Sequence, residues 1–553
     1  MLFRSNGFAR TIAEHGPDSV AFYVSGQLLT EDYYVANKLM KGFIGSANID
    51  TNSRLCMASS VAGHRRAFGG DVVPGCYEDL ELADLLVLVG SNAAWCHPVL
   101  HQRMRERNAR MVVVDPRSTA TCEGADLHLA LRPGRDAVLF NGLLVFLAAR
   151  GQLDEDFVAR HTNGFEAALA AARESAPSID AVAESCGLTV ADVHRFYEMF
   201  AATTRTVTLY SQGINQSSSG TDKVNAIINC HLATARIGRP GCGPFSLTGQ
   251  PNAMGGREVG GLANQLAAHL SIEDTEHRDR VRRFWNAPRI ADRPGLKAIE
   301  LFEAIAAGKV KAVWIMATNP ASSLPDADRV RAALAACPFV VVSDCVRRTD
   351  TAAFANVLLP AAAWGEKSGT VTNSERRISR QRAFLPLTGE ARPDWWIVCE
   401  IAKRLGHGAA FDYAGPAAIF REHAALSGYE NGGDRAFDIS GLATLDDAAY
   451  ERLSPVQWPV TDQAPTGTAR LFGDGRFTAR DGRANFAAVT PRRAGLYLHP
   501  STGPTSSRPW RAPRRWSTRR AIRSPANPNA STRRSDSSAS KRRGTASRWH
   551  ESG

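Results

Sequence analysis

The sequence has no long hydrophobic run and no apolar leader at its start. Its longest apolar stretch, 138–149, is interrupted by Asn141 and is shorter than the roughly 18–20 residues that a membrane-spanning helix needs. The first thirty residues hold no apolar core after a basic start, so we expect neither a secretory signal nor a twin-arginine leader. These absences predict a soluble cytoplasmic protein with no membrane partner.

Closely spaced cysteines are also absent. None of the ten cysteines forms C-x-x-C or C-x-x-x-C, which argues against a structural zinc site or a cluster held by neighbouring thiolates. Scattered cysteines are mostly small buried hydrophobic residues, so we expect one or two of them at most to do chemistry. They stand at positions 56, 76, 96, 122, 186, 230, 242, 337, 345 and 399.

Most of the chain carries no excess charge. The 553 residues hold 66 Lys and Arg against 55 Asp and Glu, a net charge of +11. From position 491 to the end there are 15 basic residues and two acids, so the preceding 490 residues hold 51 basic and 53 acidic groups. A nearly neutral body gives no electrostatic reason to expect nucleic-acid binding.

The basic tail, 491–553, is rich in Arg, Ser, Pro and Thr and has no hydrophobic periodicity. Such a composition predicts disorder. Because the composition changes within a few residues, we interpret the tail as the product of a shifted reading frame in GC-rich DNA. The alternative is an arm that binds RNA or a membrane.

Short apolar runs alternate with helical patterns over the rest of the chain. With 44% hydrophobic residues the chain can bury a large core. The alternation predicts parallel sheets in an α/β protein. Strands are expected at 19–24, 85–89, 111–114, 206–210, 313–316 and 339–342, and helices at 31–43, 104–110, 136–150 and, with interruptions, 181–203.

Two of these strand–helix–strand units resemble each other. In the first unit, the turn after a strand contains Asn92, and the next strand ends at Asp115, 23 residues later. In the second unit, the corresponding residues are Asn319 and Asp344, which are 25 residues apart. Ligands of doubly wound sheets bind at the carboxyl ends of the strands, so the pair suggests two nucleotide-type sites. The alternative is that each Asp only caps a turn. Neither turn has G-x-G-x-x-G, which disfavours a plain NAD site.

Three polar segments rich in Gly, Asn and Gln follow, at 212–217, 236–245 and 248–258. Backbone of this kind suits the close approach of a large polar ligand. The alternative is a long surface loop.

Three stretches together carry a family resemblance: DTNSRLCMASSVAGHRRAFG (50–69), GRPGCGPFSLTGQPNAMGGREVG (238–260) and WGEKSGTVTNSERR (364–377). They resemble the molybdopterin oxidoreductase (DMSO reductase) family, and within it the assimilatory nitrate reductases of bacteria, over about residues 10–490. The resemblance implies an α/β fold of two doubly wound, Rossmann-like domains. It also implies molybdenum held by two molybdopterin guanine dinucleotides, and nitrate assimilation by oxygen-atom transfer from nitrate.

The resemblance assigns roles to single residues. Cys56 takes the position of the metal ligand, and Met57 and Arg257 the positions that line the substrate funnel. From the residues alone, Cys56 would be a buried structural thiol, and Arg257 would form a salt bridge with Glu258 or another acid. We interpret 64–66 as structural or surface residues. The positions matching cofactor contacts are Gly90, Ser91, Asn92 and Asp115; Gly213, Asn215 and Gln216; Gly249, Gln250 and Asn252; Asn319, Asp344 and Thr349; and, with packing left as an alternative, Asn373.

The domain prediction follows the same resemblance. Residues 1–51 and 270–385 would form one discontinuous α/β domain, 52–269 a second that carries the metal ligand, and 386–490 a connecting segment. The family's iron–sulfur and C-terminal β-barrel domains are missing from the sequence, so we expect a chain truncated at both ends. A [4Fe–4S] cluster is expected in full-length members, but its cysteine ligands are not here.

Two other functions stay open. A formate dehydrogenase of the same family would use the same cofactor, although these enzymes typically have His where this chain has Met57. An inactive fragment without an electron-entry domain would bind no molybdenum. For the enzyme, the expected partners are nitrate and an electron-donor protein or reductase subunit.

Overall fold

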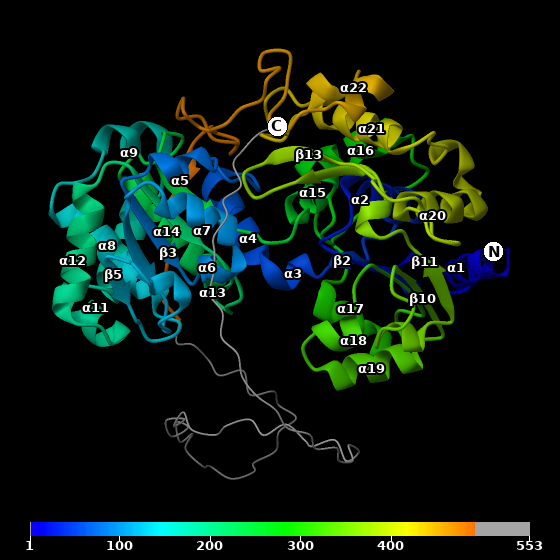
Figure 1. The fold of residues 1–553 in the computed structure, drawn as a ribbon, viewed down its shortest axis with the longest axis horizontal. Coiled ribbons are helices and arrows are strands. Elements are labelled where there is room, and N and C mark those ends of the chain that lie inside the picture. Colours follow the sequence, from blue (N-terminus) through cyan, green and yellow to red (C-terminus); the bar gives the residue numbers. More distant parts are fainter. Residues whose placement is uncertain (1, 493–553) are drawn as a thin grey trace, which may run out of the picture. The chain divides into compact units, whose positions relative to one another are not determined.

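The computed structural model describes residues 2–492, and the backbone of this part is built around two parallel β-sheets (Figure 1). All but the first two residues of the predicted disordered tail lie outside the described residues. The described residues form one compact unit. The predicted fold class, α/β with two doubly wound parallel sheets, is confirmed.

The first sheet has the strand order β11-β10-β9-β1-β2, and every neighbouring pair is parallel. It joins strands from the start of the chain to strands near residue 340, as the predicted discontinuous domain requires; the domain boundaries stay a prediction. The strands are β1 (Val20–Val24), β2 (Ile49–Thr51), β9 (Ala312–Met316), β10 (Phe339–Asp344) and β11 (Val357–Pro360).

The second sheet has the order β5-β4-β3-β7-β8, again all parallel. Its central strands are runs of Val, Leu and Thr buried on both faces, which is why they read as continuous apolar segments rather than as alternating ones. The strands are β3 (Leu85–Val89), β4 (Arg110–Val114), β5 (Leu127–Leu129), β7 (Thr206–Tyr210) and β8 (Gly243–Ser246).

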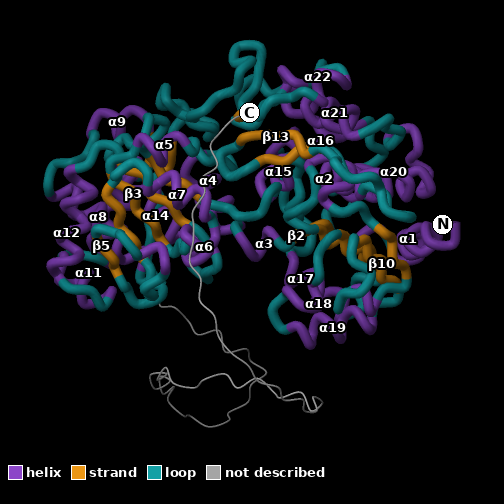
Figure 2. The backbone as a smooth tube through the Cα atoms, in the orientation of Figure 1, coloured by secondary structure: helices purple, strands orange, loops and turns teal. Residues whose placement is uncertain are grey.

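Helices flank the strands of both sheets (Figures 1 and 2). Among residues 2–492 no helix is both long and apolar enough to cross a membrane. The helices are α1 (Leu2–His15), α2 (Thr30–Asn37), α3 (Ser53–Cys56), α4 (Ala58–Phe68), α5 (Glu78–Leu82), α6 (Ala93–Cys96), α7 (Pro98–Arg105), α8 (Asp136–Ala149), α9 (Glu155–His161), α10 (Phe165–Ser175), α11 (Ile179–Cys186), α12 (Val190–Ala202), α13 (Gln212–Asn215), α14 (Gly220–Ala233), α15 (Ala253–Glu258), α16 (Thr275–Trp285), α17 (Ala298–Ala306), α18 (Pro320–Ser323), α19 (Ala327–Ala336), α20 (Asp394–Ala402), α21 (Pro416–Gly428) and α22 (Asp447–Glu451).

The predicted elements match these bounds closely, with one error. The helix expected over 104–110 is wrong, because α7 ends at Arg105 and Arg110 already belongs to β4. Four residues, 106–109, are enough to reverse the chain, and Asn108 adopts the left-handed conformation there (φ 51°). The helix expected over 31–43 consists of α2 followed by a π-helical segment, Lys38–Ile44.

A third, small sheet joins β12 (Gly369–Thr372), β13 (Arg377–Gln381) and β14 (Val456–Gln457). Arg376, fully buried at the turn before β13, connects distant segments of the chain. Its guanidinium donates to the carbonyls of Val73, Trp458, Thr468 and Ala469. Residues near 73 are thereby tied to residues near 460. A two-stranded parallel ribbon joins β6 (Thr162–Asn163) to β15 (Ala484–Asn485).

Candidate functional site

Cys56 lies where contacts from the carboxyl edges of the two sheets meet. It ends α3, a single helical turn that follows β2 directly. From the first sheet, the backbone N–H of Gly26, just past β1, donates to Asn52 Oδ1 at 2.7 Å. From the second, Gln216 Nε2, past β7, donates to the carbonyl of Leu55 at 3.0 Å. The cysteine is therefore positioned by both sheets.

Within the described part of the chain, the thiol of Cys56 accepts a hydrogen bond from a side-chain amide. Gln212 Nε2, in the turn after β7, lies 3.0 Å from Sγ. Burial raises the pKa of the Cys56 thiol, and the Gln212 hydrogen bond and the charge of Arg257 oppose that increase. Both groups favour the thiolate, which is the form that binds metals. The family motifs assign no role to Gln212, although it directly precedes Gly213.

Arg257, on α15, is nearly buried and is held by an acid. Its Nε donates to Asp71 Oδ2 at 2.7 Å, while the buried Nη1 finds no hydrogen-bond partner among the described residues. The alternative, in which Arg257 forms a salt bridge with Glu258 or another acid, is therefore correct, and the acid is Asp71. Glu258 instead accepts hydrogen bonds from Trp458 and Thr372. One side of the guanidinium is fixed, and Nη1 has donor capacity left for a ligand.

Burial shifts the pKa values of the titratable groups around this ion pair. Burial lowers the pKa of His64 and of His269 to about 4, and it raises the pKa of Glu258 to about 7. His64 Nε2 makes a hydrogen bond of 2.5 Å with the Tyr210 hydroxyl, which supports its structural interpretation. Of these groups, Arg257 is the one whose charge lowers the pKa of the Cys56 thiol.

The two repeated units share one hydrogen-bond arrangement. In the first, Thr121 Oγ1 donates to Asn92 Oδ1 at 2.9 Å and accepts the backbone N–H of Ala94 at 3.1 Å. The second repeats it with Thr351, which donates to Asn319 Oδ1 at 2.6 Å and accepts from the backbone N–H of residue 321 at 3.1 Å. Both threonines are fully buried, and neither had been singled out from the sequence.

The two strand-end acids also match. Asp115 Oδ1 accepts the backbone N–H of Arg117 at 2.9 Å, and Asp344 Oδ1 accepts that of Val346 at 2.9 Å. The turn-capping alternative is thus correct for one oxygen of each carboxylate. In residues 2–492 no second backbone N–H donates to either carboxylate, so each acid can still accept from a ligand.

The turns after β3 and β7 touch through two glycines. Gly213 N donates to the carbonyl of Gly90 at 3.0 Å. A Cβ on Gly90 would lie 2.7 Å from Gly213 Cα, and a Cβ on Gly213 would lie 2.6 Å from Gly90 Cα. The close packing of the turns is itself a reason for glycine at both positions, besides any contact with a ligand.

Several buried polar atoms beside these turns are unpaired. Ser91 Oγ, Thr248 Oγ1 and both ring nitrogens of His97 make no hydrogen bond within the described residues. They come from the turns after β3 and β8, at the same edge of the sheet. Burying such atoms without a partner costs free energy, so they fit a polar ligand with donor and acceptor groups, such as a pterin dinucleotide.

Three predicted contact residues have side-chain amides that the protein already uses. Asn215 Oδ1 accepts from the backbone and the hydroxyl of Ser60. Asn252 bonds to Leu28 O and to the backbone N–H of Thr372. Asn373 accepts from two backbone N–H groups in the β12–β13 turn. These hydrogen bonds favour packing roles for the three amides.

The other predicted residues lie in different surroundings. Gln250 accepts a hydrogen bond from Ser53 on α3 at 3.3 Å. Gly249 is exposed, and Met57 is buried directly beside Cys56. Thr349 Oγ1 accepts the backbone N–H of Ala352, so it shapes the loop that carries Thr351.

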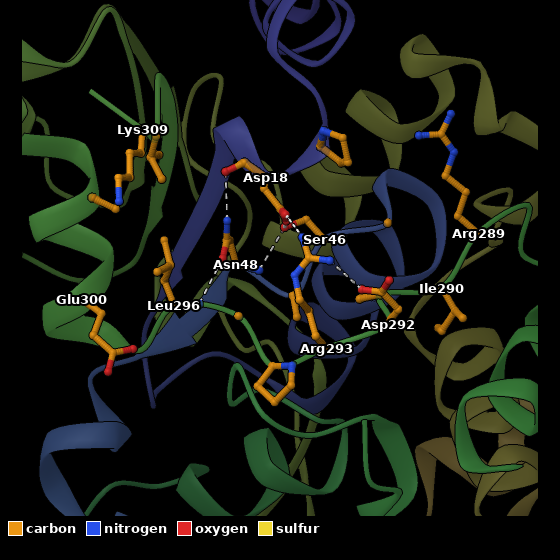
Figure 3. Close-up of a pocket in the computed structure, with 18 of the residues that line it drawn as sticks. Asp18, Ser46, Asn48, Arg289, Ile290, Asp292, Arg293, Leu296, Glu300 and Lys309 are labelled. Atoms are coloured by element: carbon orange, nitrogen blue, oxygen red, sulfur yellow. Dashed lines mark hydrogen bonds and ion pairs between the residues drawn. The ribbon is translucent and has the colours of Figure 1, made fainter. Parts of the chain in front are cut away.

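A large cavity lies elsewhere in the described residues. It has a volume of about 970 Å³, and its lining includes Asp18, Asn48 and Lys309 (Figure 3). These residues precede β1, β2 and β9, so the cavity lies at the amino ends of the strands, opposite the edge that carries Cys56. Its polar groups bond to one another: Asp18 accepts from Ser46 and Arg293, and Asn48 Oδ1 accepts the backbone N–H of Leu296. Size alone therefore does not mark the site.

Comparisons with known proteins agree on one family. The model of the molybdopterin oxidoreductase family matches residues 5–404. A nitrate reductase of Klebsiella oxytoca is 58% identical over 486 residues, which are 87% of this chain and 55% of the relative. The assimilatory nitrate reductase catalytic subunit of Bacillus subtilis is 34% identical, over 86% of this chain and 66% of the relative. The chain thus spans between half and two thirds of the length of these relatives.

A solved structure shows the same fold. Acetylene hydratase from Pelobacter acetylenicus superposes with a TM-score of 0.67 at 18% identity, covering 88% of this chain and 66% of that protein.

Proposed function

Because the chain belongs to the molybdopterin oxidoreductase family, we propose that it is the catalytic portion of an enzyme that reduces nitrate to nitrite. Family membership implies a molybdenum–molybdopterin cofactor. The observation that supports the proposal best is the position of Cys56, whose thiol is held between the carboxyl edges of both sheets within the electrostatic reach of Arg257.

The cofactor is proposed to be the bis-guanine-dinucleotide form. The duplicated arrangement supports this, because Asn92 with Thr121 and Asn319 with Thr351 repeat the same hydrogen bonds at the ends of β3 and β9. Asp115 and Asp344 would each accept N–H or O–H groups of one nucleotide. Further contacts to the first dinucleotide would come from Ser91, Thr248 and His97.

Cys56 would bind molybdenum as a thiolate, a soft ligand that suits a metal already held by sulfur. When bound, the molybdenum supplies the two-electron redox chemistry of oxygen-atom transfer. Arg257 would orient nitrate with its unpaired Nη1 and offset the negative charge of the anion, because Asp71 fixes the rest of the guanidinium. Met57, buried beside Cys56, would limit the space next to the thiol.

Electrons would come from a donor protein or a reductase subunit. The ten cysteines of this sequence include no closely spaced set for a [4Fe–4S] cluster.

The test is molybdenum content together with nitrite formation. The chain, expressed with cofactor supply, is expected to hold about one molybdenum and to form nitrite from nitrate with reduced viologen as donor. Cys56→Ala is expected to lose nearly all turnover, whereas Cys399→Ala, which removes a thiol on α20, keeps it.

Three results would contradict the proposal. Undiminished nitrite formation by Cys56→Ala would refute the role of the thiol. Formate oxidation without nitrate reduction would favour formate dehydrogenase, and a chain without molybdenum would favour the inactive fragment.

A further inference from the structure

A small polar cavity lies behind the Arg257–Asp71 pair. It has a volume of about 40 Å³, and its lining includes Arg65, Asp71, Gln265, His269 and Arg435. A water molecule needs roughly 10–15 Å³ of such space, so the cavity has room for about three waters or one four-atom anion. It is separated from Arg257 by the Asp71 side chain, which lines the cavity and holds the guanidinium.

Buried atoms in the cavity wall lack partners. Arg435 Nε and Nη1, His269 Nε2 and Gln265 Oε1 make no hydrogen bond to the described residues. Arg435 is 8% exposed and Gln265 2% exposed, and the remaining nitrogen of the Arg435 guanidinium donates to the carbonyls of Ser427 and Tyr429. Leaving an arginine nitrogen buried and unpaired is costly, so these atoms point to a ligand.

The charges of the wall favour an anion. Arg65 and Arg435 contribute two cations; among residues 2–492 neither one has a direct ion pair, and Asp434 and Asp438 act on Arg435 from a longer distance. Of the two acids, Asp71 is neutralised by Arg257, and Asp434 is exposed to solvent. His269 can donate from Nε2, so a neutral N–H donor accompanies the cations.

We propose that this cavity binds a small oxyanion of the size of nitrate or nitrite, at a second site separate from Cys56 and Arg257. Guanidinium groups and a neutral N–H donor around a space for four atoms match planar oxyanions better than chloride, which accepts without fixed directions. At such a site the Asp71 side chain would lie between the bound anion and the guanidinium of Arg257.

The test uses the full 553-residue chain purified without cofactor, so that its outcome does not depend on the proposed enzyme activity. The thermal midpoint is measured in sodium nitrate and in sodium chloride at equal ionic strength. Specific binding is expected to raise the midpoint by about 1 °C or more in saturating nitrate relative to chloride. Arg65→Gln is expected to remove this difference.

Arg66→Gln is the matched control, because Arg66 is the next residue but pairs with Asp222 outside the cavity. It should keep the nitrate effect, as should Cys56→Ala. Arg435→Met is a second variant that removes the unpaired nitrogens, and Arg65→Gln decides the matter if that variant does not fold. The proposal is overturned if nitrate and chloride act alike on the wild type, or if Arg65→Gln responds as Arg66→Gln does.

Discussion

Gln212 Nε2 donates a hydrogen bond to Cys56 Sγ at 3.0 Å, and so connects the turn after β7 to the thiol on α3. The two residues are 156 positions apart in the sequence. The contact joins a group that stabilises negative charge to the one thiol for which a metal-binding role is proposed.

Replacing Gln212 with Leu is expected to raise the pKa of the Cys56 thiol, because the hydrogen bond that lowers it is lost while burial, which raises it, remains. Alkylation of Cys56 by iodoacetamide, followed across pH by peptide mass spectrometry, should then require a higher pH. Gln216→Leu is the control, since Gln216 donates to a carbonyl and not to the thiol. Equal profiles for the two variants would contradict the prediction.

Gly90→Ala is expected to destabilise the fold by about 2–4 kcal/mol. Gly90 has a φ of +55°, and a new Cβ would also collide with Gly213. Gly151→Ala separates the two causes, because Gly151 has a φ of +63° but no atom within 4 Å of its would-be Cβ. Denaturant unfolding should give a loss of about 1 kcal/mol for the control. If Gly90→Ala lost no more unfolding free energy than Gly151→Ala, the contact between Gly90 and Gly213 would have to relax without cost.

Glu258→Gln is expected to change how stability depends on pH. The folded state raises the pKa of Glu258 from 4.5 to about 7, mainly by burial, so it binds the proton more tightly than the unfolded chain does. This group therefore lowers stability as pH rises from about 4.5 to 7, by about 2–4 kcal/mol in all. The difference in unfolding free energy between the variant and the wild type should grow in the variant's favour over that interval; a constant difference would contradict the raised pKa.

Thr121→Val and Thr351→Val are expected to weaken cofactor retention to a similar degree. Each removes the hydroxyl that fixes Asn92 or Asn319 at a strand end. The amount of guanine nucleotide released on denaturation measures retention, and Thr234→Val serves as control because its hydroxyl donates to a helix carbonyl. If retention falls for only one of the two, the repeated arrangement does not serve two equivalent sites.

The sequence predicted the sheets well for a physical reason. Buried parallel strands such as 85–89 and 206–210 are continuous apolar runs, and a polar turn follows each of them. The likeness between 92–115 and 319–344 can also be read from the sequence, because each unit is a single local segment whose two strands are close together in the chain. Thr121 and Thr351 were missed because a single Thr in a loop has no pattern of its own.

Contacts between distant residues could not be read from the chain. Asp71 and not Glu258 holds Arg257, although Glu258 is adjacent in sequence, because neighbours on a short helix point in different directions. The family resemblance predicts cofactor contacts for Asn252 and Asn373, but their amides bond to backbone. Such assignments need the tertiary arrangement, which depends on how all the loops pack.

The four carbonyls around Arg376 have a consequence for synthesis on the ribosome. Val73 lies only two residues beyond Asp71, yet the guanidinium that anchors it is completed by Trp458, Thr468 and Ala469. Nearly 400 residues must therefore be translated before this early loop acquires its final neighbours. In a chain that ends before residue 469, some N–H groups of the Arg376 guanidinium would lack their carbonyl acceptors. Such a chain would be incompletely folded around Val73 and open to degradation by proteases.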